Sequence, residues 1–385
     1  MTAASVRHPG EFRWETRLLA VVTLTLTAFG VANCYSTGAY KQLWFTEATQ
    51  QLMGAIVGGL IFLVAARTDY QLWRRLARPL FYATVAGLVL LAVVAMIWGA
   101  RPAPGPIGAL VPVINGARRW LQFGPLTLQL SEVGRFTLMA FVAARAVELG
   151  NKVRSFREGY LPLLAPVALT ALLVFLEPNL TMAVLLGTAG VMIMFIAGAR
   201  IPHLALTAMV AGAGGLLALS TGFRSARVES FGGAMTECVA HGQVCEALIG
   251  FGSGGINGLG FGEGTQKLGH LSYAYSDMIL SVIAEEFGLV GVGITMLLFA
   301  LFCWMGFRIA KTARDPFGTY LAAGLTAMVG VAAFLHAAVV LHMMPATGLT
   351  LPFISAGRVS LIMYLFTAGV VVSIGRNRGR PARGR

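Results

Sequence analysis

The residue of this chain best placed for chemistry is an aspartate, Asp277. It closes the segment Ser272–Asp277 and precedes a long apolar stretch, Met278–Phe302. A carboxylate at a membrane boundary is costly unless it is paired, hydrated or used in function. Asp277 is therefore the candidate catalytic residue.

Two adjacent arginines, Arg118 and Arg119, precede Trp120 in a separate segment. Such arginines outside a membrane can hold phosphate, and a neighbouring tryptophan can lie on a sugar face or at the lipid interface. These three residues are therefore candidate substrate contacts. The alternative is an interfacial anchor made of arginine and tryptophan.

Arg135 lies about one helical turn inside another apolar segment, for which Ser131 is the expected N-cap. An arginine within the membrane needs a partner. Asp277 is expected at the same depth with the opposite charge, so we predict that the two residues pair. The pair can serve chemistry or be purely structural. Glu132 and Arg135 both count as candidate substrate contacts.

A glycine-dense stretch precedes the aspartate. Its segment Gly252–Gly255 lets backbone amides approach a ligand closely, and such arrangements bind anions. The candidate substrate contacts in this region are Gly254, Gly255, Gln266 and Lys267. A flexible loop is the alternative. A dinucleotide site is excluded, because no strand precedes the glycines.

The segment Pro345–Ser360 leads into the last apolar stretch. Its hydroxyl groups can donate hydrogen bonds, and it carries a cation at the membrane edge. Ser355 and Arg358 are therefore candidate substrate contacts, and a broken helix entrance is the alternative.

The four cysteines divide into two pairs. Cys34 and Cys303 lie in apolar stretches and are expected to be inert. Cys238 and Cys245 share a segment outside the membrane, where a disulfide and two free thiols both remain open. Their spacing to His241 does not match a zinc site.

The amino-acid composition indicates which kind of element positions these residues. The chain has 385 residues, of which 57% are hydrophobic and only 12% are charged, whereas soluble domains carry roughly 25% charge. Repeated apolar windows of about 20 residues can each cross a bilayer. The net charge of +13 is spread over short connecting segments, a pattern that indicates membrane topology and excludes a nucleic-acid surface.

We predict an all-α polytopic membrane protein that forms a single domain over residues 1–385. The ten expected spans are Leu18–Tyr35, Gln50–Ala66, Pro79–Trp98, Ser131–Leu149, Leu161–Leu176, Leu180–Ala197, Ile201–Thr221, Asp277–Phe307, Phe317–Leu341 and Phe353–Ile374.

Basic residues alternate between the two sides of these spans, which places both termini in the cytoplasm. The cytoplasmic tails are residues 1–17 and the basic residues 377–385. Two long outer segments, Gly99–Leu130 and Gly222–Ser276, are expected to hold the chemistry, because long loops in compact proteins are usually functional or disordered. The first is expected to include a partly embedded, re-entrant piece.

These motifs together resemble the SEDS family of shape, elongation, division and sporulation proteins, the FtsW/RodA group. The first matching group is Gly116, Arg119, Trp120, Gly124, Pro125, Gln129, Ser131 and Glu132, with Arg135 at a lysine position. The second is Gly252–Gly255, Gln266, Lys267, Asp277, Val282, Ile283, Glu285, Glu286, Gly288 and Gly291. The third is Thr347, Gly348, Leu351, Pro352, Phe353, Ser355 and Gly357. Arg118-Arg119 and the compact Gly262–Leu271 segment are more similar to division-type, FtsW-like members.

The resemblance implies a peptidoglycan glycosyltransferase of the bacterial cytoplasmic (inner) membrane. Such proteins polymerise lipid II into β-1,4-linked glycan on the outer face, with a class B penicillin-binding protein as partner. The family's essential aspartate corresponds to Asp277 and its basic partner to Arg135. The aspartate can orient or deprotonate the attacking sugar hydroxyl. Cations such as Arg119, Arg135 or Lys267, alone or together with a divalent ion (Mg or Mn), can offset charge on the leaving diphosphate.

The chain departs from the family pattern at several positions. Leu130 replaces a proline and Asn179 an aspartate, and Tyr275-Ser276 replaces histidine-threonine. Near the last span, Ala356 replaces a tyrosine and Arg358 a glycine. These changes affect the expected substrate contacts.

Two other functions remain open at this point. A lipid II flippase needs polar residues deep in several spans, whereas the ionisable residues here cluster at the outer mouth, with only Glu285 and Glu286 deeper. A non-catalytic scaffold for the transpeptidase would not need Asp277.

Overall fold

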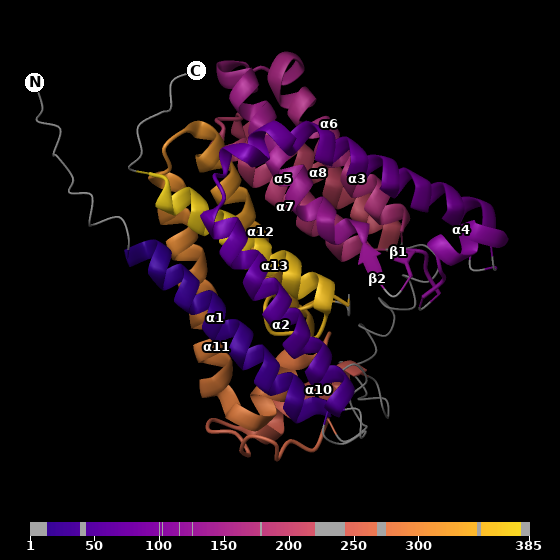
Figure 1. The fold of residues 1–385 in the computed structure, drawn as a ribbon, viewed down its shortest axis with the longest axis vertical. Helices are drawn as coiled ribbons and strands as arrows, with labels where there is room; N and C mark the ends of the chain where they lie inside the picture. Colours follow the sequence, from indigo (N-terminus) through magenta and orange to yellow (C-terminus); the bar gives the residue numbers. More distant parts are fainter. Residues whose placement is uncertain are drawn as a thin grey trace, which may run out of the picture.

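The computed structural model describes residues 14–38, 44–99, 101, 103–114, 116–124, 126–177, 179–219, 243–267, 275–344 and 348–378. Most of these residues are helical (Figure 1). The α-helices are α1 (Trp14–Gly38), α2 (Trp44–Arg67), α3 (Gln71–Trp98), α4 (Gly105–Leu110), α5 (Leu130–Leu149), α6 (Leu161–Leu176), α7 (Leu180–Ile196), α8 (Ile201–Leu219), α10 (Gln243–Gly254), α11 (Ile279–Lys311), α12 (Pro316–Val340) and α13 (Arg358–Arg376). A 3-10 turn, Gly150–Arg154, and a π-turn, Phe156–Tyr160, connect α5 to α6.

The helices have the length and composition of a multi-pass membrane protein. Among the described residues, seven helical segments are long and apolar enough to cross a membrane, and α7 and the first part of α8 are shorter apolar helices. Helices suit lipid because each satisfies its own backbone hydrogen bonds. Every predicted span overlaps one described helix, while the number of ten membrane crossings stays a prediction.

The core is helix packed on helix. Helix α13 lies along α2, α11 contacts both α1 and α12, and α3 lies along α5 (Figure 1). Small residues permit the closest approach: a Cβ on Gly369 of α13 would lie 2.6 Å from the carbonyl oxygen of Phe62 on α2. Without a strong hydrophobic drive between helices in lipid, such close backbone packing is a main source of association.

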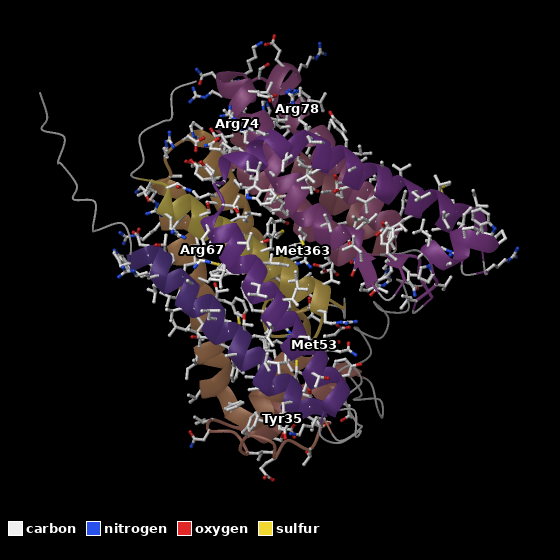
Figure 2. All side chains as sticks on the ribbon, in the orientation of Figure 1. Tyr35, Met53, Arg67, Arg74, Arg78 and Met363 are labelled. Atoms are coloured by element: carbon white, nitrogen blue, oxygen red, sulfur yellow. The ribbon has the colours of Figure 1, made fainter. Side chains whose placement is uncertain are left out.

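Arg74 and Arg78 lie toward one end of the bundle and Tyr35 toward the other, while Arg67 lies between them (Figure 2). Where α1 begins, the carboxylate of Glu15 pairs with Arg308 of α11 at 2.9 Å and with Arg378, which follows α13, at 2.7 Å. This ion-pair cluster ties three segments together at the end where α1 begins and α13 ends.

A β-hairpin that we did not predict precedes α5. Strand β1 (Trp120–Phe123) pairs antiparallel with β2 (Leu126–Gln129), and α5 begins at the next residue. The expected N-cap was wrong, because Gln129 occupies that position and Ser131 lies inside the first turn. Elsewhere in the Gly99–Leu130 segment the structure describes the short helix α4; the re-entrant course of this segment stays a prediction.

Helix α11 is broken near its start. Gly288 has φ +66°, a left-handed conformation that glycine adopts without steric cost. A Cβ there would lie 2.3 Å from the carbonyl oxygen of Ile256. The amide of Leu289 donates to the carbonyl of Gly255 at 2.9 Å. The glycine-rich segment after α10 is therefore hydrogen-bonded into the break in α11.

Candidate active site

Asp277 lies in the turn just before α11, which begins at Ile279 and not at the aspartate as predicted. The residue is half-buried. The segment that precedes α13 packs against this turn: the Ser355 hydroxyl donates to the Ser276 carbonyl at 2.6 Å. A Cβ on Gly348 would lie 3.3 Å from Oδ2 of Asp277. The carboxylate is thus held beside backbone that only a small residue can provide.

Arg135 is buried in α5, where three groups surround its guanidinium. It forms an ion pair with Glu132 one turn earlier in the same helix. Its Nη2 donates to the hydroxyl of Ser360 at 3.1 Å, and its Cζ lies 4.4 Å from the ring centroid of Tyr364. Glu132 is thus a partner that the sequence analysis missed, although its i,i+3 spacing was a usable signal. The predicted pairing of Arg135 with Asp277 stays a prediction.

One segment, residues 348–360, connects the surroundings of both charged residues. Its Gly348 lies beside Asp277, and its Ser360 receives the Arg135 hydrogen bond. Thr350 and Ser360 are joined by a hydroxyl–hydroxyl hydrogen bond of 3.3 Å. A carboxylate before α11 and a guanidinium from α5 therefore both border the entrance to α13, although more than 140 residues of sequence separate them. This arrangement can orient a hydroxyl and stabilise negative charge nearby.

The side chain of Arg118 is hydrogen-bonded to backbone carbonyl oxygens. Its guanidinium is buried and donates to the carbonyl oxygens of Gly99 at 2.9 Å, of Arg101 at 2.5 Å and of Val111. Buried carbonyls need such partners, so Arg118 holds the loop around α4 together. We do not retain it as a substrate contact.

Arg119 connects the hairpin to the turn between α6 and α7. Its Nε donates to the carbonyl oxygen of Glu177 at 2.7 Å. The side chain of Glu177 is fully buried. Burial raises the pKa of this carboxyl to about 8, although the nearby charge of Arg119 acts in the opposite direction. Nothing in the sequence signals that this glutamate is buried.

Replacing Glu177 by glutamine is expected to flatten the dependence of stability on pH. The carboxyl has its ordinary pKa of 4.5 when unfolded and about 8 when folded, so the folded state holds the extra proton between these values. Stability is therefore fully present below about pH 4.5 and falls by up to about 1.4 kcal/mol per pH unit as pH rises toward 8. Thermal unfolding in detergent between pH 5 and 8 measures this slope. The exposed Glu158→Gln variant is the control; an unchanged slope in Glu177→Gln would contradict the assignment.

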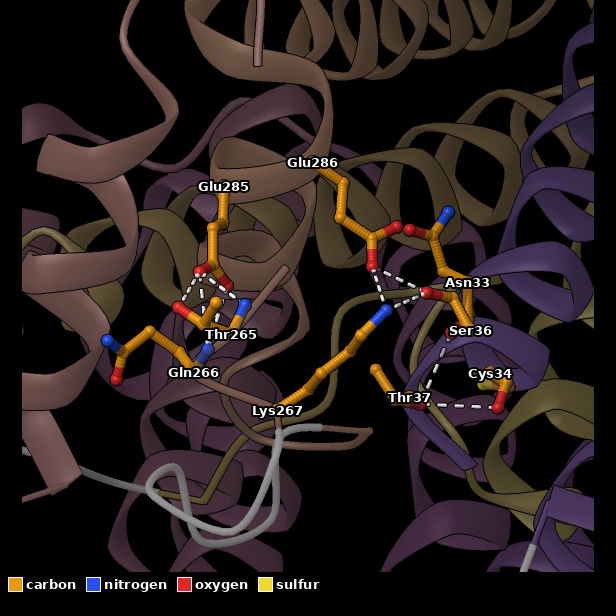
Figure 3. Close-up of polar contacts among 9 residues, drawn as sticks. All are labelled: Asn33, Cys34, Ser36, Thr37, Thr265, Gln266, Lys267, Glu285 and Glu286. Atoms are coloured by element: carbon orange, nitrogen blue, oxygen red, sulfur yellow. Dashed lines mark hydrogen bonds and ion pairs between the residues drawn. The ribbon is translucent and has the colours of Figure 1, made fainter. Parts of the chain in front are cut away.

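Lys267 is buried in an ion pair rather than directed at a ligand (Figure 3). Its Nζ donates to Oε1 of Glu286 at 2.6 Å and to the hydroxyl of Ser36 at 2.7 Å. The Ser36 hydroxyl in turn donates to the same carboxylate oxygen at 2.5 Å. This network joins the loop after α10 to α11 and α1, and the substrate contact predicted for Lys267 stays a prediction.

The neighbouring glutamate binds the same loop (Figure 3). Glu285 Oε1 accepts from the amide of Thr265 at 2.7 Å and from its hydroxyl at 2.9 Å, and the amide of Gln266 donates to the carboxylate at 3.2 Å. The backbone amides of Thr265 and Gln266 thus bind an anion, which is the protein's own carboxylate; the anion site expected at Gly252–Gly255 is a different segment. The side-chain role predicted for Gln266 stays a prediction.

The glycine motif also differs from the prediction. Gly254 ends α10 and is helical, and a Cβ on it would lie 2.0 Å from the carbonyl oxygen of Ala284 on α11. Its role is therefore close helix packing. Gly255, with φ +54°, makes the turn that follows.

The remaining candidates are distributed around the same end of the bundle. Ser355 is buried and accepts a hydrogen bond from the amide of Leu351 at 2.8 Å, so it shapes the loop beside Asp277. Arg358 is exposed and begins α13, while Trp120 is half-buried and begins β1. Their substrate contacts stay predictions.

The described cysteines agree with the expected division. Cys34 and Cys303 are reduced cysteines outside any disulfide, and Cys245 is disulfide-bonded. Cys238, the partner considered in the sequence analysis, lies outside the described residues.

The sequence is similar to known cell-cycle proteins over almost its whole length. The family model described as cell cycle protein, covering FtsW, RodA and SpoVE, matches residues 16–380. A Geobacter metallireducens protein named probable peptidoglycan glycosyltransferase FtsW is 33% identical, covering 94% of this chain and 96% of its own. Stage V sporulation protein E of Bacillus subtilis is 32% identical, covering 93% of this chain and 96% of its own.

Solved structures have the same fold. The rod shape determining protein RodA of Thermus thermophilus superposes with a TM-score of 0.67 at 25% identity, covering 94% of this chain and 97% of that chain. A chain from a peptidoglycan synthase complex gives a TM-score of 0.75 at 23% identity, covering 94% and 98% respectively. With a family match over residues 16–380, the chain belongs to the FtsW/RodA/SpoVE family of cell cycle proteins.

Proposed function

We propose that this protein is a peptidoglycan glycosyltransferase that polymerises lipid II into β-1,4-linked glycan strands. The observation that carries the proposal is the position of Asp277, a half-buried carboxylate packed against the segment that enters α13. The printed names of the FtsW relatives give the reaction class. Because those names are mostly FtsW, we favour a role in division over one in elongation.

The proposed reaction joins two lipid-linked saccharides. The 4-hydroxyl of one sugar attacks the anomeric carbon of the other, a new C–O bond forms, and the bond to the diphosphate breaks. Asp277 accepts a hydrogen bond from the attacking hydroxyl and takes up its proton as the C–O bond forms. The lipid diphosphate leaves with the electron pair of the broken bond.

The leaving diphosphate needs positive charge. Arg135 reaches the same α13 entrance as Asp277, and a fixed cation in such a water-poor site stabilises developing negative charge. Among the described residues, no group of three or more His, Cys, Asp or Glu side chains could hold a metal ion. The proposed steps are written with the side chains of the chain itself, and the Mg or Mn ion expected from the sequence stays a prediction.

We place this reaction at the outer face of the bacterial cytoplasmic membrane. Support comes from Figure 2, where Arg74 and Arg78 lie at the end opposite to Tyr35, as the positive-inside rule requires if the end that carries these two arginines is cytoplasmic. We propose a class B penicillin-binding protein as the partner. A structural relative comes from a complex described as coordinating polymerization and crosslinking, two activities that such a partnership combines.

The experiment that tests the function is polymerisation of labelled lipid II by the purified protein with its transpeptidase. The transpeptidase is blocked with a β-lactam, so that uncrosslinked glycan remains. We expect a ladder of glycan products that a muramidase digests. No ladder, together with movement of labelled lipid II across liposome membranes that contain the protein, would replace this proposal with a flippase.

A further inference from the structure

A small pocket opens beside the candidate catalytic turn. Its volume is about 110 Å³. Its lining residues are Gln50, Gln51, Tyr275, Ala356, Gly357 and Arg358. A cavity needs only about 10–15 Å³ of such space to hold one water molecule, so the pocket has room for a compact polar group.

The pocket wall is fixed by hydrogen bonds between α2 and the segment before α13. Buried Gln51 donates through Nε2 to the Ser355 carbonyl at 3.1 Å, and its Oε1 accepts from the amide of Gly357 at 3.2 Å. On the other side, the amide of Ala356 donates to the carbonyl of Tyr275 at 2.8 Å. Tyr275 lies two residues before Asp277, so the pocket borders the proposed reaction site directly.

The electrostatics of the pocket favour an anion. Arg358 is exposed and is the first residue of α13, where the positive end of the helix dipole disfavours a cation. Neither Arg358 nor Gln50 has a side-chain hydrogen bond or ion pair with any residue that the structure describes. A negatively charged group in the pocket would satisfy the guanidinium, the helix end and the Gln50 amide together.

We propose that this pocket binds an anionic oxygen group of the lipid-linked substrate, with Arg358 as the charged donor and Gln50 as the neutral one. The group is a phosphate of the diphosphate or a carboxylate of the peptide, since both present the oxygens that an arginine fork binds. The identity of the substrate rests on the proposed function; the anion site does not.

Equilibrium binding to an Arg358→Ala variant tests the proposal. The probes are undecaprenyl diphosphate, lipid II, and lipid II with its stem-peptide carboxylates amidated. Losing a hydrogen-bonded charge contact is expected to weaken binding by about 10- to 100-fold. Arg101→Ala, at another exposed arginine, is the matched control, and Arg358→Lys should lose only part of the affinity because it keeps the charge without the fork.

The three probes distinguish the two sources of the anion. If the Arg358→Ala variant binds undecaprenyl diphosphate more weakly than the native protein, the ligand is phosphate. If only lipid II with free carboxylates is affected, the ligand is the peptide. Native affinity of Arg358→Ala for all three probes, with an unchanged melting temperature, overturns the proposal. Because the readout is binding, a native protein that makes no polymer would refute the proposed function and leave this test valid.

Discussion

Replacing Lys267 by methionine is expected to destabilise the folded protein by about 3–5 kcal/mol, because the change leaves a buried carboxylate without its cation. Lys267 and Glu286 are 2.6 Å apart, with side-chain exposures of 3% and 0%. Methionine keeps most of the side-chain volume, so little of the effect comes from lost packing. The melting temperature in detergent, relative to the native protein, measures the loss.

A double variant separates the loss of the ion pair from other effects of the Lys267→Met change on stability. Lys267→Met combined with Glu286→Leu removes both charges, and well-packed apolar replacements of a buried pair are often neutral or stabilising. We therefore expect the double variant to regain most of the lost stability. Lys311→Met, at an exposed lysine that ends α11, is the matched control. A double variant as unstable as the Lys267→Met single variant would contradict the pairing as the source of stability.

Asp277→Asn is expected to lower kcat for lipid II polymerisation by about 10²–10⁴-fold, the range that a general base contributes. Asparagine keeps the size and the hydrogen-bonding atoms but cannot take up a proton near neutral pH. Affinity for lipid II should change much less, because other side chains bind the substrate. Single-turnover rates together with equilibrium binding separate the two effects. If binding falls as steeply as the rate, Asp277 is a binding residue and not a base.

The helices could be predicted from sequence because few other backbone structures are stable in lipid. Apolar runs such as Leu180–Ala197 and Phe317–Leu341 coincide with α7 and α12 within a few residues. The hairpin before α5 was missed because its strands have only four residues each, too few for an alternating pattern to appear. The Gly124-Pro125 dipeptide between them was its one turn signal.

The charge partners were harder to predict than the helices. The sequence placed Arg135 and Asp277 at a similar depth, but Glu132 is available one turn away in the same helix. Two adjacent glutamates on α11, Glu285 and Glu286, point about 100° apart around the helix axis. One therefore meets backbone amides of the loop and the other meets Lys267. Which of the two glutamates pairs with Lys267 depends on the path of a glycine-rich loop, and sequence patterns do not specify that path.

The role of the glycines shows the same limit. The sequence indicates that Gly254 permits close approach of another group, and the structure identifies that group as neighbouring backbone, as it does at Gly288. Close helix packing and close approach of a ligand both require a residue without a Cβ, so the presence of a glycine does not distinguish between the two roles. The pocket at Arg358 likewise required three segments that are distant in sequence to come together.

The most direct test of the central claim compares the glycan made from lipid II by the native protein, Asp277→Asn and Glu263→Gln at equal amounts of folded protein. Glu263 is an exposed carboxylate outside the proposed site, so its replacement serves as the matched control. We predict a full ladder of products from the native protein and from Glu263→Gln, and almost none from Asp277→Asn. A ladder of native intensity from Asp277→Asn would contradict the assignment of this aspartate as the catalytic residue.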